Sequence, residues 1–156
     1  MTPRFVRLGN PNLTCRDLLD LSLDAVAGLQ AMVLESVGPI RHAVRVPFHD
    51  SQARKKAILI RTDWDTVEHN TPGPYLHEDL VFRLIRAKVR LVGVDFDGVD
   101  CSQLIANDIV VVQNLAGLKS LPKTGFRFFA VPSPGKGQTT DVRAFAEINA
   151  ESASSA

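Results

Sequence analysis

The polar residues best suited to catalysis or metal binding lie where apolar stretches of this sequence end, and in the loops that follow. They are Asp63 and Asp65 after ILIRT, Asp95, Asp97 and Asp100 after LVGV, and Gln113 after IVVV. Carboxylates gathered at strand ends could hold a cation, but Asp is also common there because it caps helices and hydrogen-bonds the backbone of turns. We expect the structural role for most of these aspartates. A glutamine that ends a buried strand, directly before Asn114, has no such ordinary explanation.

Cysteine supplies the other candidate group. Cys15 and Cys101 lie far apart and lack CxxC spacing, so the sequence indicates neither a disulfide framework nor a thiolate zinc site, and both are expected to be reduced. Cys101 stands at the start of an expected short helix, where the helix dipole can lower a thiol pKa. Because no His is placed to act as its base, a buried or half-buried free thiol is the favoured interpretation.

Two further patterns carry weaker signals. The four histidines lack the two-His spacing of a metal motif and are interpreted as surface or loop residues; they are His42, His49, His69 and His77. The segment SPGKGQTT, residues 133–140, has the glycines and lysine of a phosphate loop without the full spacing or the helix that must follow. A mobile hairpin loop is expected instead. Trp64 and Tyr75 are expected to border any pocket that lies nearby.

Composition excludes several classes of partner. With 18 basic and 17 acidic side chains among 156 residues, the net charge is +1, which gives no electrostatic basis for binding nucleic acid or an anionic membrane. No apolar run approaches the roughly 20 residues of a membrane span, and the start MTPRFVRLGN lacks the apolar stretch of a secretion signal. We expect a cytoplasmic protein with one domain over residues 1–150 and a disordered tail, ESASSA, over 151–156.

Periodicity predicts a mixed α/β sheet. Residues 76–89 form the most secure helix, with Leu76, Leu80 and Leu84 on its apolar face. A short helix is expected over 100–108, and a helix or amphipathic loop over 17–29. Strands are expected over 29–36, 55–62, 90–96, 109–115, 125–133 and 142–148. The order strand, helix, strand, short helix, strand indicates parallel pairing through right-handed crossovers, with ligands near the carboxyl ends of the strands.

Segments of this chain, in their order and spacing, resemble the cyclase family that includes bacterial kynurenine formamidase and isatin hydrolase. They are ILIRTDWDT, LVGVDFDGVD, VVVQNLAGLKSLP, GFRFFAVP and VRAFAEI, and the resemblance covers residues 18–149. It implies a swivelling β/β/α fold, a homodimer or higher oligomer, and an arylformamidase-like, metal-dependent hydrolase of N-formyl or cyclic amides. The implied cofactor is zinc or manganese, which polarises the amide carbonyl and activates a water.

The ligand positions of the family are altered in this chain. The family's N-terminal His-x-Gly-Thr-His-x-Asp motif is absent, and Arg4 stands near the place of a further His. Cys101 stands where the resemblance places a ligand His, and Gln113 where it places a ligand Glu. A neutral amide oxygen is a weaker donor to a hard cation than a carboxylate, and a reactive zinc site needs about three protein ligands.

Two hypotheses follow from this resemblance. In the first, the site is rebuilt, and hydrolysis needs residues outside this chain or from a partner subunit. In the second, the chain is a pseudoenzyme that retains only the fold and acts as a binding or interaction protein. The resemblance also implies that the first strands of the family fold are lacking, which predicts an uncovered apolar sheet surface, and therefore dimerisation or a marginally stable monomer.

Overall fold

A computed structural model describes residues 2–36, 43–44, 46–66, 73–133 and 135–149. The strands are β1 (Arg4–Arg7), β2 (Asn12–Thr14), β3 (Leu29–Glu35), β4 (Ala43–Val44), β5 (Ala57–Arg61), β6 (Tyr75–Leu76), β7 (Leu91–Val94), β8 (Val110–Gln113), β9 (Phe126–Pro132) and β10 (Thr139–Ile148). The helices are α1 (Asp50–Ala53), α2 (Glu78–Arg86) and α3 (Ser102–Ala106). Short 3-10 turns are η1 (Leu18–Asp20), η2 (Leu23–Ala25), η3 (Trp64–Thr66) and η4 (Leu118–Ser120).

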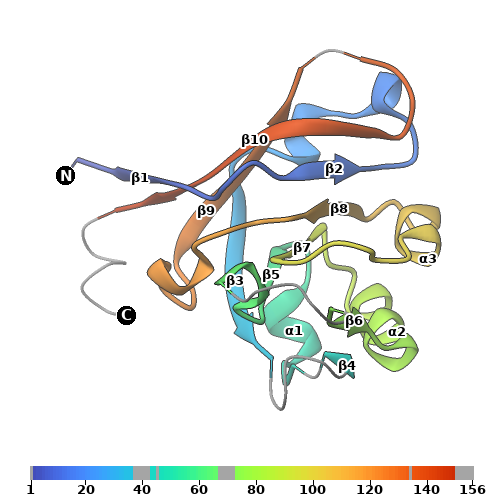
Figure 1. The fold of residues 1–156 in the computed structure, drawn as a ribbon, viewed down its shortest axis with the longest axis horizontal. Helices are drawn as coiled ribbons and strands as arrows, with labels where there is room; N and C mark the ends of the chain where they lie inside the picture. Colours follow the sequence, from blue (N-terminus) through green and yellow to red (C-terminus); the bar gives the residue numbers. More distant parts are fainter. Residues whose placement is uncertain (1, 37–42, 45, 67–72, 134, 150–156) are drawn as a thin grey trace.

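The main sheet closes on itself as a mixed barrel (Figure 1). Its strands are hydrogen-bonded in the order β10-β2-β8-β7-β5-β3-β9, and β9 pairs again with β10 to complete the ring. The neighbours β3, β5, β7 and β8 run parallel, and the remaining pairs are antiparallel. The sequence predicts parallel pairing for β5, β7 and β8. β1 lies outside the ring, paired with β10. The carboxyl ends of the four parallel strands therefore meet at one end of the barrel.

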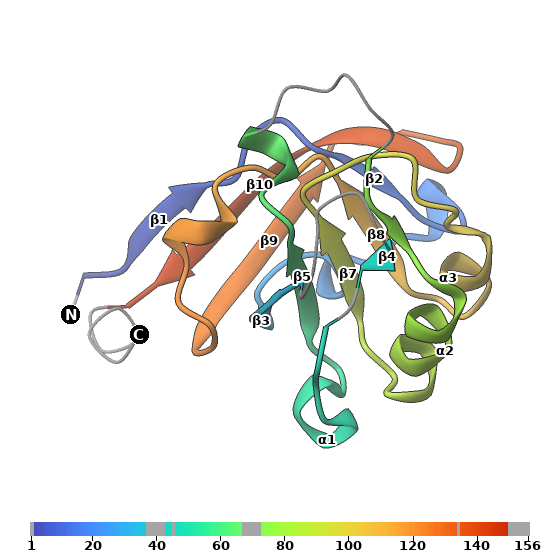
Figure 2. The ribbon, with the colours of Figure 1, turned by 60° about the horizontal axis from the view of Figure 1, so that its bottom comes forward.

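The parallel strands are apolar throughout because each of them has two buried faces. In β5, Ala57 and Leu59 face the barrel interior, whereas Ile58 and Ile60 belong to a second core under the helices. Figure 2 shows α1, α2 and α3 on the side of β5, β7 and β8. The interior is tightly filled: a Cβ on Gly93 would lie 2.7 Å from the side chains of Leu59 and Leu115. These two layers fix the ends of the parallel strands firmly.

Helix α2 confirms the most secure sequence prediction but is shorter than expected. His77 caps its start by accepting a hydrogen bond from the Asp79 N–H, and Leu80 and Leu84 are buried. The helix ends at Arg86 because Lys88 adopts a left-handed conformation with φ of 57°. Val89 is buried, but in the turn that leads into β7 rather than in the helix.

The N-terminal part of the chain differs most from expectation. Residues 17–29 form two 3-10 turns, and the strands β1 and β2 were not foreseen. The prediction of an uncovered apolar sheet surface is wrong for the barrel. The described chain closes the ring with its own β2 and β10, which cover the interior cluster containing Leu13, Ala144 and Ala146.

The predictions of a missing membrane span, a disordered tail and a single domain have different outcomes. Within the described ranges, no helix is long and apolar enough to cross a membrane. The prediction of a disordered tail falls on residues 151–156, which lie outside the described residues. The single domain over residues 1–150 stays a prediction.

Candidate functional site

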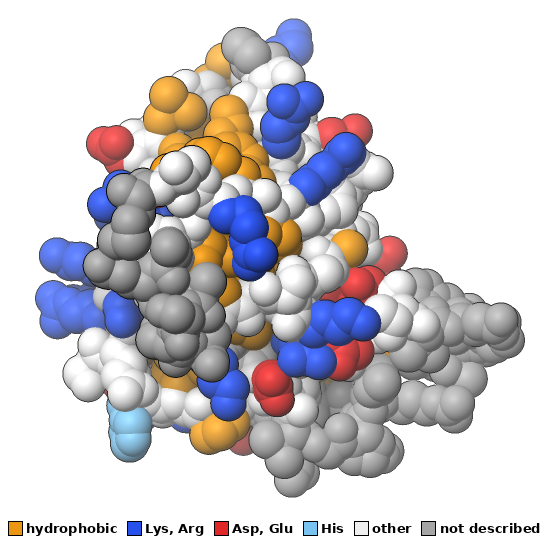
Figure 3. All heavy atoms as spheres, turned by 90° about the vertical axis from the view of Figure 1, so that its left-hand side faces the viewer, with side chains coloured by type: hydrophobic (Ala, Val, Ile, Leu, Met, Phe, Trp, Pro, Cys, Tyr) orange, Lys and Arg blue, Asp and Glu red, His pale blue; other side chains and the backbone are white. Residues whose placement is uncertain are grey.

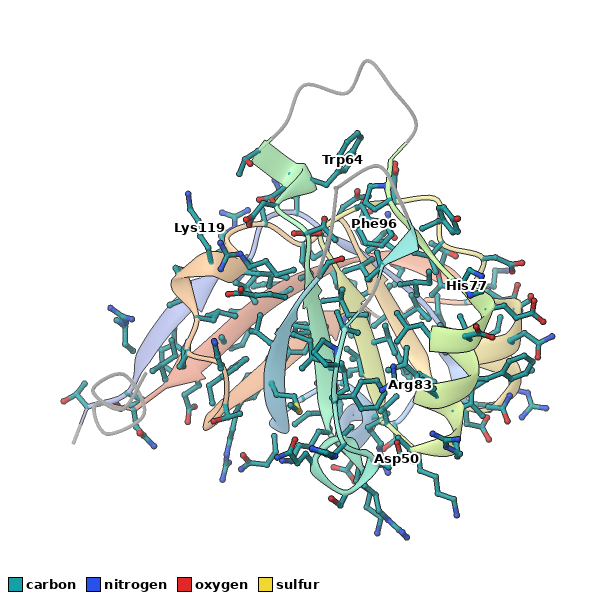
Figure 4. All side chains as sticks on the ribbon, turned by 90° about the horizontal axis from the view of Figure 1, so that it is seen from below. Asp50, Trp64, His77, Arg83, Phe96 and Lys119 are labelled. Atoms are coloured by element: carbon teal, nitrogen blue, oxygen red, sulfur yellow. The ribbon has the colours of Figure 1, made fainter. Side chains whose placement is uncertain are left out.

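Acidic side chains gather at the carboxyl ends of β5 and β7. Carboxylate oxygens of Asp63, Asp65 and Asp95 all lie within 4.8 Å of one another. Parallel pairing brings them together, because β5 leads directly into Asp63 and β7 into Asp95. Figure 4 shows Trp64 and Phe96 at this end of the barrel and Asp50 at the opposite end. By its oxygen donors, this group could hold a cation.

Asp95 is the buried centre of this acidic group. Its side chain is only 2% exposed. Its Oδ2 accepts hydrogen bonds from the backbone N–H groups of Thr62 and Asp63, both at 2.8 Å, and its Oδ1 accepts one from the Thr62 hydroxyl. Burial raises the pKa of Asp95, and these hydrogen bonds oppose the rise. The carboxylate therefore holds the chain as it leaves β5.

Asp63 forms an ion pair with Arg61. Arg61 Nε and Nη2 donate to the two carboxylate oxygens of Asp63 at 2.8 and 3.0 Å, and Arg61 Nη1 reaches Glu35 at 3.0 Å. The hydrogen bond from Arg61 lowers the pKa of Asp63, and Lys119 adds to that effect. Asp63 also has a left-handed backbone, with φ of 62°, a conformation that Asp adopts more readily than most non-glycine residues.

Asp65 completes the group from the η3 turn. Its Oδ2 accepts a hydrogen bond from the Gly117 N–H at 3.2 Å, so it ties this loop to the one that follows β8. Each of the three carboxylates thus has a protein donor. A cation at this position would compete with the guanidinium of Arg61 and with the backbone N–H groups on Asp95.

Cys101 and Gln113, the positions that the resemblance matches to metal ligands, lie in contact. Gln113 Nε2 donates to Cys101 Sγ at 3.8 Å, and Gln113 Oε1 accepts from the Val99 N–H at 2.9 Å. Cys101 Sγ in turn donates to the Val99 carbonyl at 3.4 Å. These bonds form a closed, neutral circuit in which both side chains hold the loop between β7 and α3. This circuit explains why β8 ends on a glutamine.

The donor set around this circuit does not fit a hydrolytic metal ion. Burial, with a smaller contribution from Asp100, raises the pKa of the Cys101 thiol, which opposes thiolate formation. The Gln113 oxygen already accepts a backbone hydrogen bond. Within the described part of the chain, Cys101 belongs to no group of three His, Cys, Asp or Glu side chains placed to share a metal. The same pKa shift also disfavours an activated nucleophile.

The remaining candidates fall in structural positions. Asp100 accepts hydrogen bonds from the backbone and hydroxyl of Ser102 at the start of α3. Of SPGKGQTT, Ser133 and residues 135–138 lie in the connection between the antiparallel β9 and β10, and Thr139 and Thr140 begin β10; this fits a hairpin and not a phosphate loop, which a helix must follow. Trp64 is 5% exposed and Tyr75 52% exposed.

The histidines are at helix starts where the structure describes them. His77 caps α2, and His49 precedes α1 without a side-chain cap hydrogen bond. His42 and His69 lie outside the described residues.

Arg61 and Thr62 are the residues that the sequence analysis missed. Both directly precede Asp63, so the pattern RTD contained the signal: a cation two residues before a carboxylate and a hydroxyl next to it. The hydrogen bonds of Thr62 to Asp95, across 33 residues, depend on strand pairing, which no local pattern specifies.

No protein-family model matches this sequence, and no curated protein is significantly similar to it. Solved structures are similar. One is described as a potential metal-dependent hydrolase with cyclase activity; it is 13% identical, with a TM-score of 0.72 over 95% of this chain and 88% of its own. A second, described as a predicted metal-dependent hydrolase from Bacillus stearothermophilus, is 13% identical, with a TM-score of 0.67 over 94% and 87% of the two chains.

A third similar structure is isatin hydrolase A from Labrenzia aggregata, bound to benzyl benzoate. It is 16% identical, with a TM-score of 0.71 over 94% of this chain and 83% of its own. At such low identities the likeness establishes the fold alone. It does so over nearly the whole chain, in agreement with the order of segments in the sequence. The protein has the fold of the cyclase-type, isatin hydrolase-like metal-dependent hydrolases.

Proposed function

We propose that this chain is a cyclase-fold protein, related to metal-dependent hydrolases of N-formyl or cyclic amides, in which that hydrolysis is impaired or lost. The swivelling β/β/α arrangement belongs to the same proposal. The observation that carries it is the closed circuit of Cys101, Gln113 and Val99. Where a metal-dependent hydrolase needs charged, available ligands, this chain has a neutral amide and a protonated thiol that already bind each other and the backbone.

Zinc or manganese would supply a polarised carbonyl and an activated water if it were bound. The residues at the implied ligand positions act differently in this chain. Gln113 and Cys101 position the loop after β7, and neither offers a base or a free anionic donor.

Metal content tests this proposal directly. The purified chain and the double variant Cys101→His, Gln113→Glu are incubated with zinc or manganese, desalted, and measured by elemental analysis. We expect less than stoichiometric metal in the unmodified chain and no turnover of N-formylkynurenine or isatin above the buffer rate. Stoichiometric metal together with turnover in the unmodified chain would overturn the proposal.

The acidic group supports the alternative hypothesis of a rebuilt metal site, which a variant of Asp65 tests separately. If the unmodified chain binds metal, Asp65→Asn distinguishes the two locations, because Asp65 lies in the acidic group and does not contact the circuit. Loss of metal in Asp65→Asn would assign the ion to the acidic group. Loss in Gln113→Ala would assign it to the family position. Asp97→Asn is the matched control, because Asp97 is exposed and lies two residues after Asp95 without belonging to the acidic group.

A binding or interaction role is the second candidate function, and an exposed aromatic surface supports it. Phe5, on β1, is 58% exposed and packs edge-on against Phe145, whose ring stacks on that of Phe129 at 4.8 Å. Figure 3 shows hydrophobic side chains among Lys and Arg on the side of the molecule that carries the N-terminal strand. We name Phe5, Phe129 and Phe145 the aromatic face.

Self-association through the aromatic face accounts for the homodimer or higher oligomer that the resemblance implies. β1 pairs only with β10 among the described strands, so its other edge can accept a second strand. Sedimentation of the unmodified chain and of Phe5→Ser tests this. We expect a dimer that Phe5→Ser dissociates, and a melting temperature that falls on dilution. A monomer whose cooperative melt at high temperature is unchanged by dilution would contradict the expectation.

A further inference from the structure

A cavity of about 530 Å³ lies at the end of the barrel opposite the acidic group. It forms where the segment after β2, containing η1 and η2, passes the amino ends of β7 and β8. Figure 1 shows the chain leaving β2 at the end of the barrel where α3 leads into β8. Arg90 directly precedes β7 and Asp95 directly follows it, so the whole length of that strand separates this cavity from the acidic group.

The floor of the cavity is apolar. Cys15, Ile109 and Val110 line it and are all buried, and Leu21 and Ala25 from the neighbouring turns add partly buried carbon surface. Burial raises the pKa of the Cys15 thiol, so this cysteine is an uncharged part of the floor. Small-molecule sites typically combine such an apolar lining and a volume of roughly 300–1,000 Å³ with a few polar groups.

The arginines on the rim of the cavity, Arg16 and Arg90, differ in their partners. Arg16 pairs with Asp108 at 3.1 Å, so the charges of these two rim residues are balanced. Asp17 accepts a hydrogen bond from the Leu19 N–H and caps η1. Arg90 is exposed and, among the residues that the structure describes, forms no ion pair. A guanidinium beside an apolar floor is suited to the planar, bidentate recognition of a carboxylate.

The negative charges on the rim also disfavour ligands that carry several negative charges. Asp17, Asp20 and Asp108 stand on the same rim, so a polyphosphate or a nucleic acid would meet more repulsion than a single carboxylate held on Arg90. We propose that this cavity binds a small organic carboxylate, with its anionic group on Arg90 and its apolar body over Cys15, Ile109 and Val110.

The probe for this site is 2-naphthoate, with 2-naphthylmethanol as its uncharged analogue. Binding is measured by titration calorimetry and located by amide chemical shifts in heteronuclear NMR spectra of the full chain. We expect saturable binding of one naphthoate, shifts concentrated around Cys15, Arg90 and Ile109, and affinity for the alcohol lower by about tenfold, since a charge-assisted hydrogen bond is lost.

Arg90→Met keeps most of the apolar stem and removes the guanidinium. We expect it to weaken naphthoate binding by about tenfold while leaving the alcohol unaffected. Arg127→Met, an exposed arginine on β9, is the matched control and is expected to bind naphthoate as the unmodified chain does. Equal affinity of the Arg90→Met and unmodified chains would overturn the proposal. So would shifts located at the carboxyl ends of the parallel strands, or no binding at about 10 mM naphthoate.

Discussion

The carboxyl ends of the parallel strands contain two neighbouring regions that are held in opposite ways. At β5 and β7, the acidic group of Asp63, Asp65 and Asp95 is held by an arginine and by backbone donors. At β8 and α3, Gln113 and Cys101 hold a loop through hydrogen bonds among neutral groups. The first region has the charge that a cation needs but few free donor positions, and the second has no charge.

This difference shows that charge alone does not identify a functional site. Asp95 resembles a catalytic or metal-binding residue because it is buried and its pKa is raised. Its oxygens nevertheless accept three hydrogen bonds from Thr62 and Asp63. Its role in this structure is to fasten two strand ends together. Gln113 fastens the loop between β7 and α3 in a similar way, through hydrogen bonds of its side-chain amide.

The largest expected effect is at Asp95. Asp95→Ala removes the acceptor of two backbone N–H groups and a hydroxyl, so we expect a loss of about 2–4 kcal/mol in the free energy of unfolding, measured by urea denaturation. Asp95→Asn is expected to lose less, because its amide oxygen can still accept both N–H groups. The exposed Asp97→Ala is the control, expected within about 0.5 kcal/mol of the unmodified chain. Equal losses for Asp95→Ala and Asp97→Ala would contradict the structural role.

An intermediate effect is expected at Gln113. Gln113→Ala leaves the partly buried Val99 N–H without its acceptor and removes the partner of the Cys101 sulfur, so we expect a loss of about 1–2 kcal/mol by the same measurement. Hydrogen exchange at the Val99 amide should accelerate. Gln103→Ala, an exposed glutamine on α3, is the control with the same change of side chain. Unchanged protection of Val99 would show that the circuit does not hold the loop.

The smallest effect is expected at Asp63. Its pairing with Arg61 is partly exposed to solvent, so Asp63→Asn should lose less than about 1 kcal/mol at pH 7. Because pairing lowers the pKa of Asp63 below its ordinary value of 3.8, this contribution is present above that value and is lost as the pH falls through the lower folded pKa. The stabilities of the variant and the unmodified chain should therefore converge in acid. A difference that grows as the pH falls would contradict the pairing.

Part of this arrangement was predictable from the sequence. The runs ILIRT and LVGV, each followed by aspartates, correctly placed carboxylates at strand ends. The resemblance of CSQLIANDIVVVQNL to the family singled out Cys101 and Gln113, whose mutual contact appears only in the structure. The spacing of Leu80 and Leu84 gave the main helix. Such features are local, because strand and helix periods depend on neighbouring residues.

The remainder depended on tertiary structure. β1 and β2 escaped prediction because short, partly exposed strands such as RFVR carry little periodicity. Their pairing partners in β8 and β10 also lie about a hundred residues or more along the chain. Closure of the barrel followed from that pairing, and it covers apolar sheet surface of the kind that was predicted to be uncovered.

By itself, the sequence determined which groups of this protein are available for chemistry: aspartates after β5 and β7, a cysteine before α3, and a glutamine at the end of β8. Only the tertiary structure decided their partners. Arg61 neutralises Asp63, backbone donors surround Asp95, and Gln113 binds Cys101 and Val99. The physical reason is that a hydrogen bond needs two groups within about 3 Å in a suitable direction, and residues far apart in a chain reach that geometry only when strands pair and the barrel closes.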